Sequence, residues 1–117
     1  MPLVSVVMTT YDETKKELNN SINSILNQTF KHFELIIVDD NPKSLKLKKY
    51  LIDEKKKDDR ILIVFNKTNL GPELSKNSGI RIANGKYIAI MDADDVSNKN
   101  RFNSQLNFIK KYNLDFV

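Results

Sequence analysis

The sequence predicts an α/β fold in which a mostly parallel sheet is flanked by helices. Two observations lead to this prediction. Short apolar, β-branched runs alternate with stretches whose apolar residues recur at helical spacing, as in chains built from strand–helix units. Each strand-like run ends in polar residues, which is typical of buried parallel strands joined by loops. The length of 117 residues fits one domain of ordinary size and no second one.

The first strands and helices follow from local patterns. Residues 4–8 (VSVVM) predict a buried first strand, and residues 35–38 (LIIV) predict the second. Between them an amphipathic helix is expected from apolar residues at i, i+4, i+7 and i+8, namely Leu18, Ile22, Ile25 and Leu26. A weaker, lysine-rich helix follows, with Leu47, Tyr50 and Leu51 on its apolar face.

The second half of the chain repeats this alternation. Residues 61–65 (ILIVF) predict the third strand and residues 87–91 (YIAIM) the fourth. Gly71-Pro72 predicts a helix start, because proline suits a first turn, and Gly85 is expected to end this helix in a left-handed conformation. The inner face of the helix carries small residues that imply close packing on the sheet: Ser75, Ser78, Gly79 and Ile82.

The last predicted elements are a helix and the start of a fifth strand. The helix carries Phe102, Leu106 and Ile109 on one face, and the strand begins at residues 115–117. Because the chain stops inside this predicted strand, we expect the natural protein to continue and regard this chain as a truncated part of it.

The composition excludes several classes of protein. The chain has no cysteine, which excludes a disulfide framework, a zinc–thiolate site and a thiol nucleophile. The net charge is +4, and acidic residues flank the densest basic cluster, Lys55–Lys57, so we expect a solvated helix end and no nucleic-acid partner. Apolar runs of five residues or fewer predict no transmembrane segment, and the N-terminus shows no signal peptide.

The predicted topology turns the strand ends into a map of a site. In parallel α/β sheets, ligands bind outside the carboxyl ends of the strands. Residues 9–13, 39–42, 66–72 and 92–95 should therefore share one rim. No G-x-G-x-x-G follows the first strand and no G-x-x-x-x-G-K-[ST] occurs, which argues against a dinucleotide fold of the usual kind and excludes a P-loop.

The acidic run Asp92-Ala93-Asp94-Asp95 is the strongest chemical signal. Alternate carboxylates at a strand end suit one hard cation such as Mg²⁺ or Mn²⁺, whose shell is completed by water and substrate phosphates. Asp95 is then free to cap the following helix. The alternative is that all three acids are turn and cap residues, but three acids in four positions exceed what capping needs.

Other polar residues on the rim are weaker signals. Asp39-Asp40 offers a carboxylate to a base or a ribose hydroxyl, or forms a turn before Pro42. The loop 9–13 offers hydroxyls and an aromatic face, with Asp12 or Thr14 as alternative helix caps. Lys76, near a helix N-terminus, suits a phosphate contact or is solvent-exposed. His32 is expected to be a packing or surface residue.

Four segments together resemble the nucleotide-binding half of a family 2 glycosyltransferase with the Rossmann-like GT-A fold. They are residues 4–11, 34–40, 69–79 and 85–95, so the resemblance covers nearly the whole chain. Each segment alone is unspecific, whereas their order and spacing together are specific. The resemblance makes residues 1–117 the nucleotide-sugar-binding part of the domain and places the acceptor-binding part beyond residue 117.

The resemblance implies a role for each matching residue on the base side. Thr9 and Tyr11 would line the nucleotide pocket, with Glu13 close by. Asp39 would bind the base, most often uracil. Relatives commonly have Gly-Ser after the paired aspartates, whereas this chain has Asn41-Pro42, so the loop on the base side is expected to differ in shape.

On the phosphate side, Asp92 and Asp94 match the D-x-D motif of the family. The resemblance places Asp92 near the ribose or the metal and makes Asp94 a ligand of Mn²⁺ or Mg²⁺. Lys76 stands where many relatives carry arginine and would contact phosphate. Arg101 matches a recurrent arginine that braces the site. The catalytic carboxylate of the family lies C-terminal to this region, so no general base is assigned.

The implied activity is inverting transfer of a sugar from a nucleoside diphosphate sugar, with UDP as the expected nucleotide, to a saccharide or lipid-linked acceptor. The fragment alone is expected to bind donor and metal but to catalyse little. The resemblance suggests cell-envelope polysaccharide synthesis in the cytoplasm, at the inner face of the membrane. Two alternatives are a magnesium-binding phosphoacceptor receiver, whose acids would follow the first and third strands, and a non-catalytic interaction domain whose acids are only caps.

Overall fold

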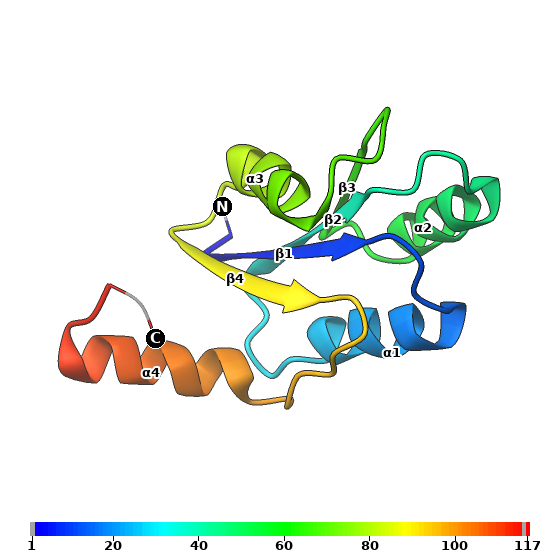
Figure 1. The fold of residues 1–117 in the computed structure, drawn as a ribbon. Helices are drawn as coiled ribbons and strands as arrows, with labels where there is room; N and C mark the ends of the chain where they lie inside the picture. Colours follow the sequence, from blue (N-terminus) through cyan, green and yellow to red (C-terminus); the bar gives the residue numbers. More distant parts are fainter. Residues whose placement is uncertain (1, 116) are drawn as a thin grey trace.

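A computed structural model describes residues 2–115 and residue 117. Strands and helices alternate along the chain (Figure 1). In order, they are β1 (Val4–Thr10), α1 (Lys15–Leu26), β2 (Phe33–Asp39), α2 (Leu45–Lys57), β3 (Ile61–Phe65), α3 (Pro72–Ile82), β4 (Tyr87–Asp92) and α4 (Arg101–Tyr112). The predicted alternation and the α/β class are confirmed.

The strands form one sheet in the order β3-β2-β1-β4, and each neighbouring pair is parallel. The chain winds from β1 outward to β3 and then crosses to the other side of β1 to form β4. The strand order therefore reverses between β1 and β4, which makes their carboxyl ends the switch point of the topology. The register sets Thr9 beside Asp92 on one neighbour and Val38 on the other.

Helices cover both faces of the sheet unequally. Val4, Val6 and Met8 of β1 point into the main core, which also receives the apolar faces of α1, α2 and α4. Val7, with Ile36 and Val38 of β2, points to the opposite face, which α3 covers. Figure 1 shows α3 on one side of the sheet and α1 and α4 on the other. This division arises because successive side chains along a strand point to opposite faces of the sheet.

The close packing predicted for α3 is confirmed at Ser75 and Gly79, which are buried. A Cβ atom at Gly79 would lie 2.6 Å from Cγ1 of Val7, so the helix approaches the sheet through a residue without a side chain. The prediction is wrong for Ile82, which is 43% exposed, and Ser78 is only half-buried. A four-residue pattern in a short helix does not determine how far its face is rotated toward the sheet.

The predicted left-handed helix end at Gly85 is also wrong. The helix stops at Ala83, which has extended backbone, and among the described glycines only Gly71 has a positive φ, 86°. Gly85 instead lies against β1, where an added Cβ would be 2.7 Å from the backbone nitrogen of Ser5. The glycine is needed for close approach between two segments rather than for its conformation.

Two helix starts differ in how well the sequence predicts them. Thr14, rather than Asp12, caps α1 and forms a reciprocal capping box with Glu17. Asp95 does not cap α4, because that helix begins only at Arg101, after Asn100. Residues 96–98 between them have no regular secondary structure, and residues 99–100 form a turn. The predicted fifth strand includes Phe116, which lies outside the described residues, and Asp115 belongs to no strand.

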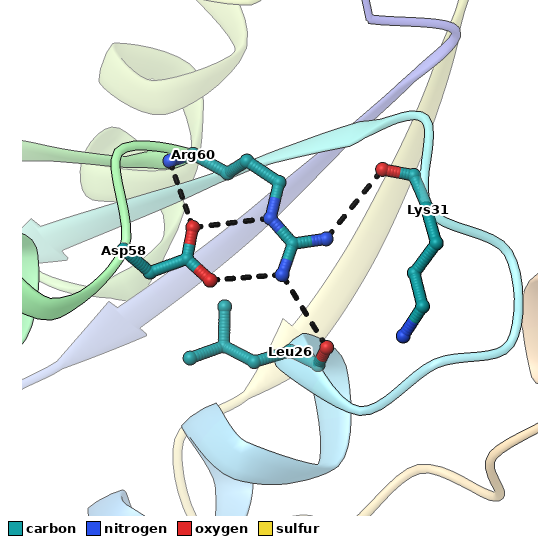
Figure 2. Close-up of polar contacts among 4 residues, drawn as sticks. All are labelled: Leu26, Lys31, Asp58 and Arg60. Carbon is teal, nitrogen blue, oxygen red and sulfur yellow. Dashed lines mark hydrogen bonds and ion pairs between the residues drawn. The ribbon is translucent and has the colours of Figure 1, made fainter.

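Arg60 ties three segments together at the amino end of the sheet (Figure 2). Its guanidinium forms a two-point ion pair with Asp58, with Nη2 2.8 Å from Oδ2 and Nε 3.0 Å from Oδ1. It also donates to the carbonyl oxygens of Leu26 and Lys31 and lies 4.3 Å from the ring centre of Phe33. The last turn of α1 has no basic residue of its own, so Arg60 supplies the cation that a helix C-terminus favours.

Candidate functional site

A cavity of about 620 Å³ opens at the carboxyl edge of the sheet, over the switch point between β1 and β4. Its walls come from the loops that follow β1, β2, β3 and β4. The lining residues are Thr9, Thr10, Tyr11, Glu13, Asp40, Asn69, Gly71, Pro72, Asp92, Ala93 and Asp94. Of the residues predicted to bind nucleotide or metal, the fold brings Thr9, Tyr11, Glu13, Asp92 and Asp94 together here.

The loop after β1 is closed by Glu13. Oε1 of Glu13 accepts a hydrogen bond of 2.7 Å from the hydroxyl of Thr10 and one of 3.0 Å from the backbone N–H of Tyr11. This leaves the ring of Tyr11 half exposed beside the cavity, while Thr9 is only partly exposed. The loop therefore presents a hydroxyl and an aromatic ring on a turn that an internal carboxylate holds in shape.

The three acids after β4 are exposed and clustered. One carboxylate oxygen of each of Asp92, Asp94 and Asp95 lies within 4.8 Å of the others. Ala93 between them is buried and anchors the loop to the core, and the N–H of Asp95 donates to the carbonyl oxygen of Asp92 to form a turn. Oxygen ligands on opposite sides of Mg²⁺ or Mn²⁺ are separated by about 4 Å, so the cluster has a suitable size for one such ion.

Asp39 is buried and faces its own turn. Its Oδ1 accepts a hydrogen bond of 2.8 Å from the N–H of Asn41, and burial is the main reason that its pKa is raised above the ordinary value. Asn41 in turn donates from Nδ2 to the carbonyl oxygen of Tyr11 at 2.9 Å. Asn41 thus links the loops that follow β1 and β2. Asp39 itself does not line the cavity.

Asp40, by contrast, lines the cavity, whereas the family resemblance assigns the base to Asp39 of this pair. Its carboxylate accepts hydrogen bonds from the N–H groups of Leu70 and Gly71 and from Nδ2 of Asn66. Burial raises the pKa of Asp40, but these hydrogen bonds outweigh that effect and hold it below the ordinary value. The sequence contains one indication of this role. Gly71 precedes a helix and has no side chain that could cap it, so a carboxylate from elsewhere in the chain is free to bind there.

Three other predicted residues lie away from this cavity. Lys76 is half-buried on α3 and does not line it. Arg101 borders a second cavity of about 600 Å³, which shares Asp92 with the first, and its guanidinium donates to the carbonyl oxygen of Ile90 and the hydroxyl of Ser97. His32 is exposed at the opposite end of the sheet, near Arg60.

The electrostatics of the cavity favour a bound cation. Four lining residues are acidic, namely Glu13, Asp40, Asp92 and Asp94, and none of the described residues that line it is lysine, arginine or histidine. A phosphate group entering this cavity would meet carboxylates of the same charge. A divalent cation held by Asp92 and Asp94 would supply the positive charge that offsets this repulsion.

None of the helices in residues 2–115 is both long and apolar enough to cross a membrane.

Comparison with known proteins gives the family. Residues 5–117 match the family described as "Glycosyl transferase family 2". An uncharacterised glycosyltransferase of Methanocaldococcus jannaschii is 48% identical over 109 residues, covering 93% of this chain and 38% of that protein. A putative teichuronic acid biosynthesis glycosyltransferase of Bacillus subtilis is 32% identical over 115 residues, covering 98% of this chain and 45% of that protein. The chain thus spans less than half the length of both relatives.

Solved structures show the same fold. The crystal structure of residues 1–349 of S. aureus TarS in complex with UDP-GlcNAc has a TM-score of 0.81 and 28% identity, covering 97% of this chain and 32% of that chain. The mannosyltransferase PcManGT from Pyrobaculum calidifontis, in complex with GDP-Man and Mn²⁺, has a TM-score of 0.82 and 18% identity, covering 92% of this chain and 32% of that chain. The architecture described above is therefore that of GT-A glycosyltransferases.

Proposed function

Because this chain belongs to glycosyl transferase family 2, we propose that it forms the donor-binding part of an enzyme that transfers a sugar from a nucleoside diphosphate sugar to an acceptor hydroxyl. The observation that carries the proposal is the cavity at the switch point. It is lined both by Thr9 and Tyr11, at the end of β1, and by the acids at the end of β4. The UDP-GlcNAc complex of a structure that is 28% identical supports a UDP-linked donor.

We assign Asp92 and Asp94 to the divalent metal. Both line the cavity, both are exposed, and their carboxylate oxygens lie close enough to share one ion. Mn²⁺ or Mg²⁺ bound there would supply positive charge that stabilises the departing diphosphate. Asp95 lies within the same cluster but does not line the cavity, so we expect it to contribute less to binding.

The base and ribose are assigned to the residues at the ends of β1 and β2. Thr9 and Tyr11 line the cavity beside Glu13, which holds their loop in shape. We propose that Asp39 accepts a hydrogen bond from the uracil N–H after a change in its surroundings, because its carboxyl is now buried against Asn41. A phosphate contact from Lys76 also stays a proposal, since this side chain lies outside the cavity wall.

The proposed reaction is a single displacement with inversion. The bond from the acceptor oxygen to the anomeric carbon forms while the bond from that carbon to the diphosphate oxygen breaks, and the electron pair leaves with the diphosphate. The acceptor proton passes to a carboxylate base. We assign no residue of this chain to that base and propose that it comes from the additional length that the relatives carry.

We propose the acceptor and the pathway from the name of a relative. A saccharide or lipid-linked acceptor in cell-envelope polysaccharide synthesis is supported by the relative whose name refers to teichuronic acid biosynthesis. The alternative of a phosphoacceptor receiver is disfavoured, because the clustered acids follow β4 and the chain matches the glycosyltransferase family over residues 5–117.

Calorimetric titration of the chain with UDP, with and without Mn²⁺, tests the proposal. We expect Mn²⁺-dependent binding that Asp94→Asn abolishes, because this substitution removes a charged oxygen ligand and leaves the shape almost unchanged. The matched control is Asp53→Asn, which removes the same charge from an exposed position on α2, far along the chain from the acids after β4.

Loss of UDP binding in the control as well would mean that general charge, and not the acidic cluster, governs binding. A folded chain that binds none of UDP, GDP and dTDP in the presence of Mn²⁺ would contradict a complete donor site in these 117 residues.

A further inference from the structure

The carboxylate of Asp40 forms an internal clamp on the loop between β3 and α3, residues 66–71. Oδ1 accepts hydrogen bonds from the N–H of Leu70 at 2.7 Å and from Nδ2 of Asn66 at 2.9 Å, and Oδ2 accepts one from the N–H of Gly71 at 2.9 Å. Nδ2 of Asn66 also donates to the hydroxyl of Ser75 at 2.9 Å, inside α3. One carboxylate therefore links the end of β2 to the loop and to the helix after it.

Backbone contacts strengthen the same connection. The N–H of Asp40 donates to the carbonyl oxygen of Thr10 at 2.9 Å, and its carbonyl oxygen accepts from Nδ2 of Asn69 at 3.2 Å. Asp40 thus holds the loop after β3 against the loop after β1. The three segments meet at the edge of the cavity, and Asn69 and Gly71 form part of its wall.

The burial and hydrogen bonds of Asp40 show that its carboxylate binds the protein itself and is not free to bind a ligand. Asp40 is only 4% exposed, and both of its carboxylate oxygens already accept hydrogen bonds from the protein. It lies at the N-terminus of α3, where Gly71 offers no capping side chain and the partial positive charge of the helix favours an anion. The N–H groups of Leu70 and Gly71, the two residues directly before the helix, are therefore already bound to an internal carboxylate.

We propose that Asp40 is a positioning residue of the donor site, which fixes residues 66–71 as one wall of the cavity without contacting the donor. The inference rests on the proposed function in so far as the donor occupies this cavity. Hydrogen bonds to a charged acceptor are stronger than neutral ones, so an ionised carboxylate at this point gives the loop one defined arrangement.

The variant Asp40→Asn tests the clamp. Asparagine has nearly the same shape, but one oxygen becomes an NH₂ group, which then faces an N–H donor and cannot accept its hydrogen bond. We expect the amide protons of Leu70 and Gly71 to lose their protection in hydrogen exchange. We also expect the affinity for UDP with Mn²⁺ to fall about tenfold, the equivalent of one hydrogen bond to a charged group.

The matched control is Asp58→Asn. Asp58 is also an aspartate that accepts several hydrogen bonds, here from Arg60, but it lies at the amino end of the sheet, opposite the cavity. We expect this variant to lower the melting temperature and to leave UDP affinity and exchange in residues 66–71 unchanged. If Asp40→Asn does not fold, Asn66→Ala keeps the carboxylate, removes one donor to it, and should change both readouts in the same direction by less.

Unchanged protection of Leu70 and Gly71 in Asp40→Asn would overturn the proposal, as would lost protection with unchanged UDP affinity. Equal loss of affinity in Asp58→Asn would reduce Asp40 to a general stabilising residue. If the wild-type chain binds none of UDP, GDP and dTDP in the presence of Mn²⁺, a complete donor site in this chain is contradicted, and the exchange measurement then decides by itself whether Asp40 fixes the loop.

Discussion

The hydroxyl of Ser5 in β1 donates a hydrogen bond of 2.6 Å to Oε2 of Glu34, which lies beside it on β2. The same two side chains hold the turn between α3 and β4. Oε2 of Glu34 accepts from the N–H of Asn84 at 2.7 Å, and the hydroxyl oxygen of Ser5 accepts from the N–H of Gly85 at 2.7 Å. This buried network anchors the connection to β4, the strand that carries the acidic cluster.

We expect Gly85→Ala to destabilise the fold by about 1–3 kcal/mol, the usual cost of an extra group in a packed site. The added Cβ would lie 2.7 Å from both the backbone nitrogen and the hydroxyl oxygen of Ser5, and the backbone cannot move aside without disturbing β1. Thermal unfolding measures the effect. Lys86→Ala at the exposed neighbouring position is the control, and an equal loss there would contradict the explanation by close approach.

We expect Arg60→Lys to lower the stability by about 1–2 kcal/mol, because lysine keeps the charge but cannot form the two-point pair with Asp58 and reach the carbonyl oxygen of Leu26 as well. UDP affinity should stay unchanged, since Arg60 lies at the amino end of the sheet (Figure 2). Denaturant unfolding checks the first expectation and calorimetry the second. Arg81→Lys, on the exposed side of α3, should change neither quantity.

The stability of the chain should depend on the ionisation of Asp40. Burial raises its pKa, yet its hydrogen bonds outweigh burial and hold the pKa below the ordinary value of 3.8. A carboxyl with a lowered pKa in the folded chain stabilises the fold above pH 3.8, and this contribution is lost as the pH falls through the folded-state pKa. The difference in melting temperature between wild type and Asp40→Asn should therefore be largest at neutral pH and shrink in acid.

Asp39 should behave in the opposite way. Burial is the main cause of its raised pKa, so its favourable contribution is present below the ordinary value of 3.8 and is lost as the pH rises through the folded-state pKa. Asp39→Asn should gain stability relative to wild type as the pH rises. Melting temperatures measured across the same pH series would contradict this assignment if both variants showed the same trend.

Two of the clustered acids, Asp94 and Asp95, should differ in their contribution to Mn²⁺ binding. We expect Asp94→Asn to weaken Mn²⁺ binding in the presence of UDP by at least about tenfold, and Asp95→Asn to weaken it less, because only Asp94 of the two lines the cavity. Electron paramagnetic resonance of free Mn²⁺ measures the bound fraction directly. Equal losses in the two variants would make Asp95 a metal ligand in its own right.

Most of the fold follows from local patterns. The β-branched runs and the helical spacing predict each strand and helix within a few residues. A strand buried on both faces needs a continuous apolar run, whereas a helix packed on one face needs apolar residues three and four positions apart. The two helix-cap predictions failed for different reasons. Gly85 looks like a helix cap until β1 is seen beside it, and Asp95 looks like a cap until α4 is seen to begin at Arg101.

The candidate site, like the fold, has features that local sequence predicts and features that it does not. Local sequence is enough to predict that acids and hydroxyls follow strands at one edge of a parallel sheet, because strand ends are set by local polarity and parallel strands share a direction. The different roles of the neighbours Asp39 and Asp40 depend on long-range contacts. They have the same side chain, but only Asp40 meets the N–H groups of Leu70 and Gly71, which lie 30 and 31 residues away in the sequence and are brought to it by the fold.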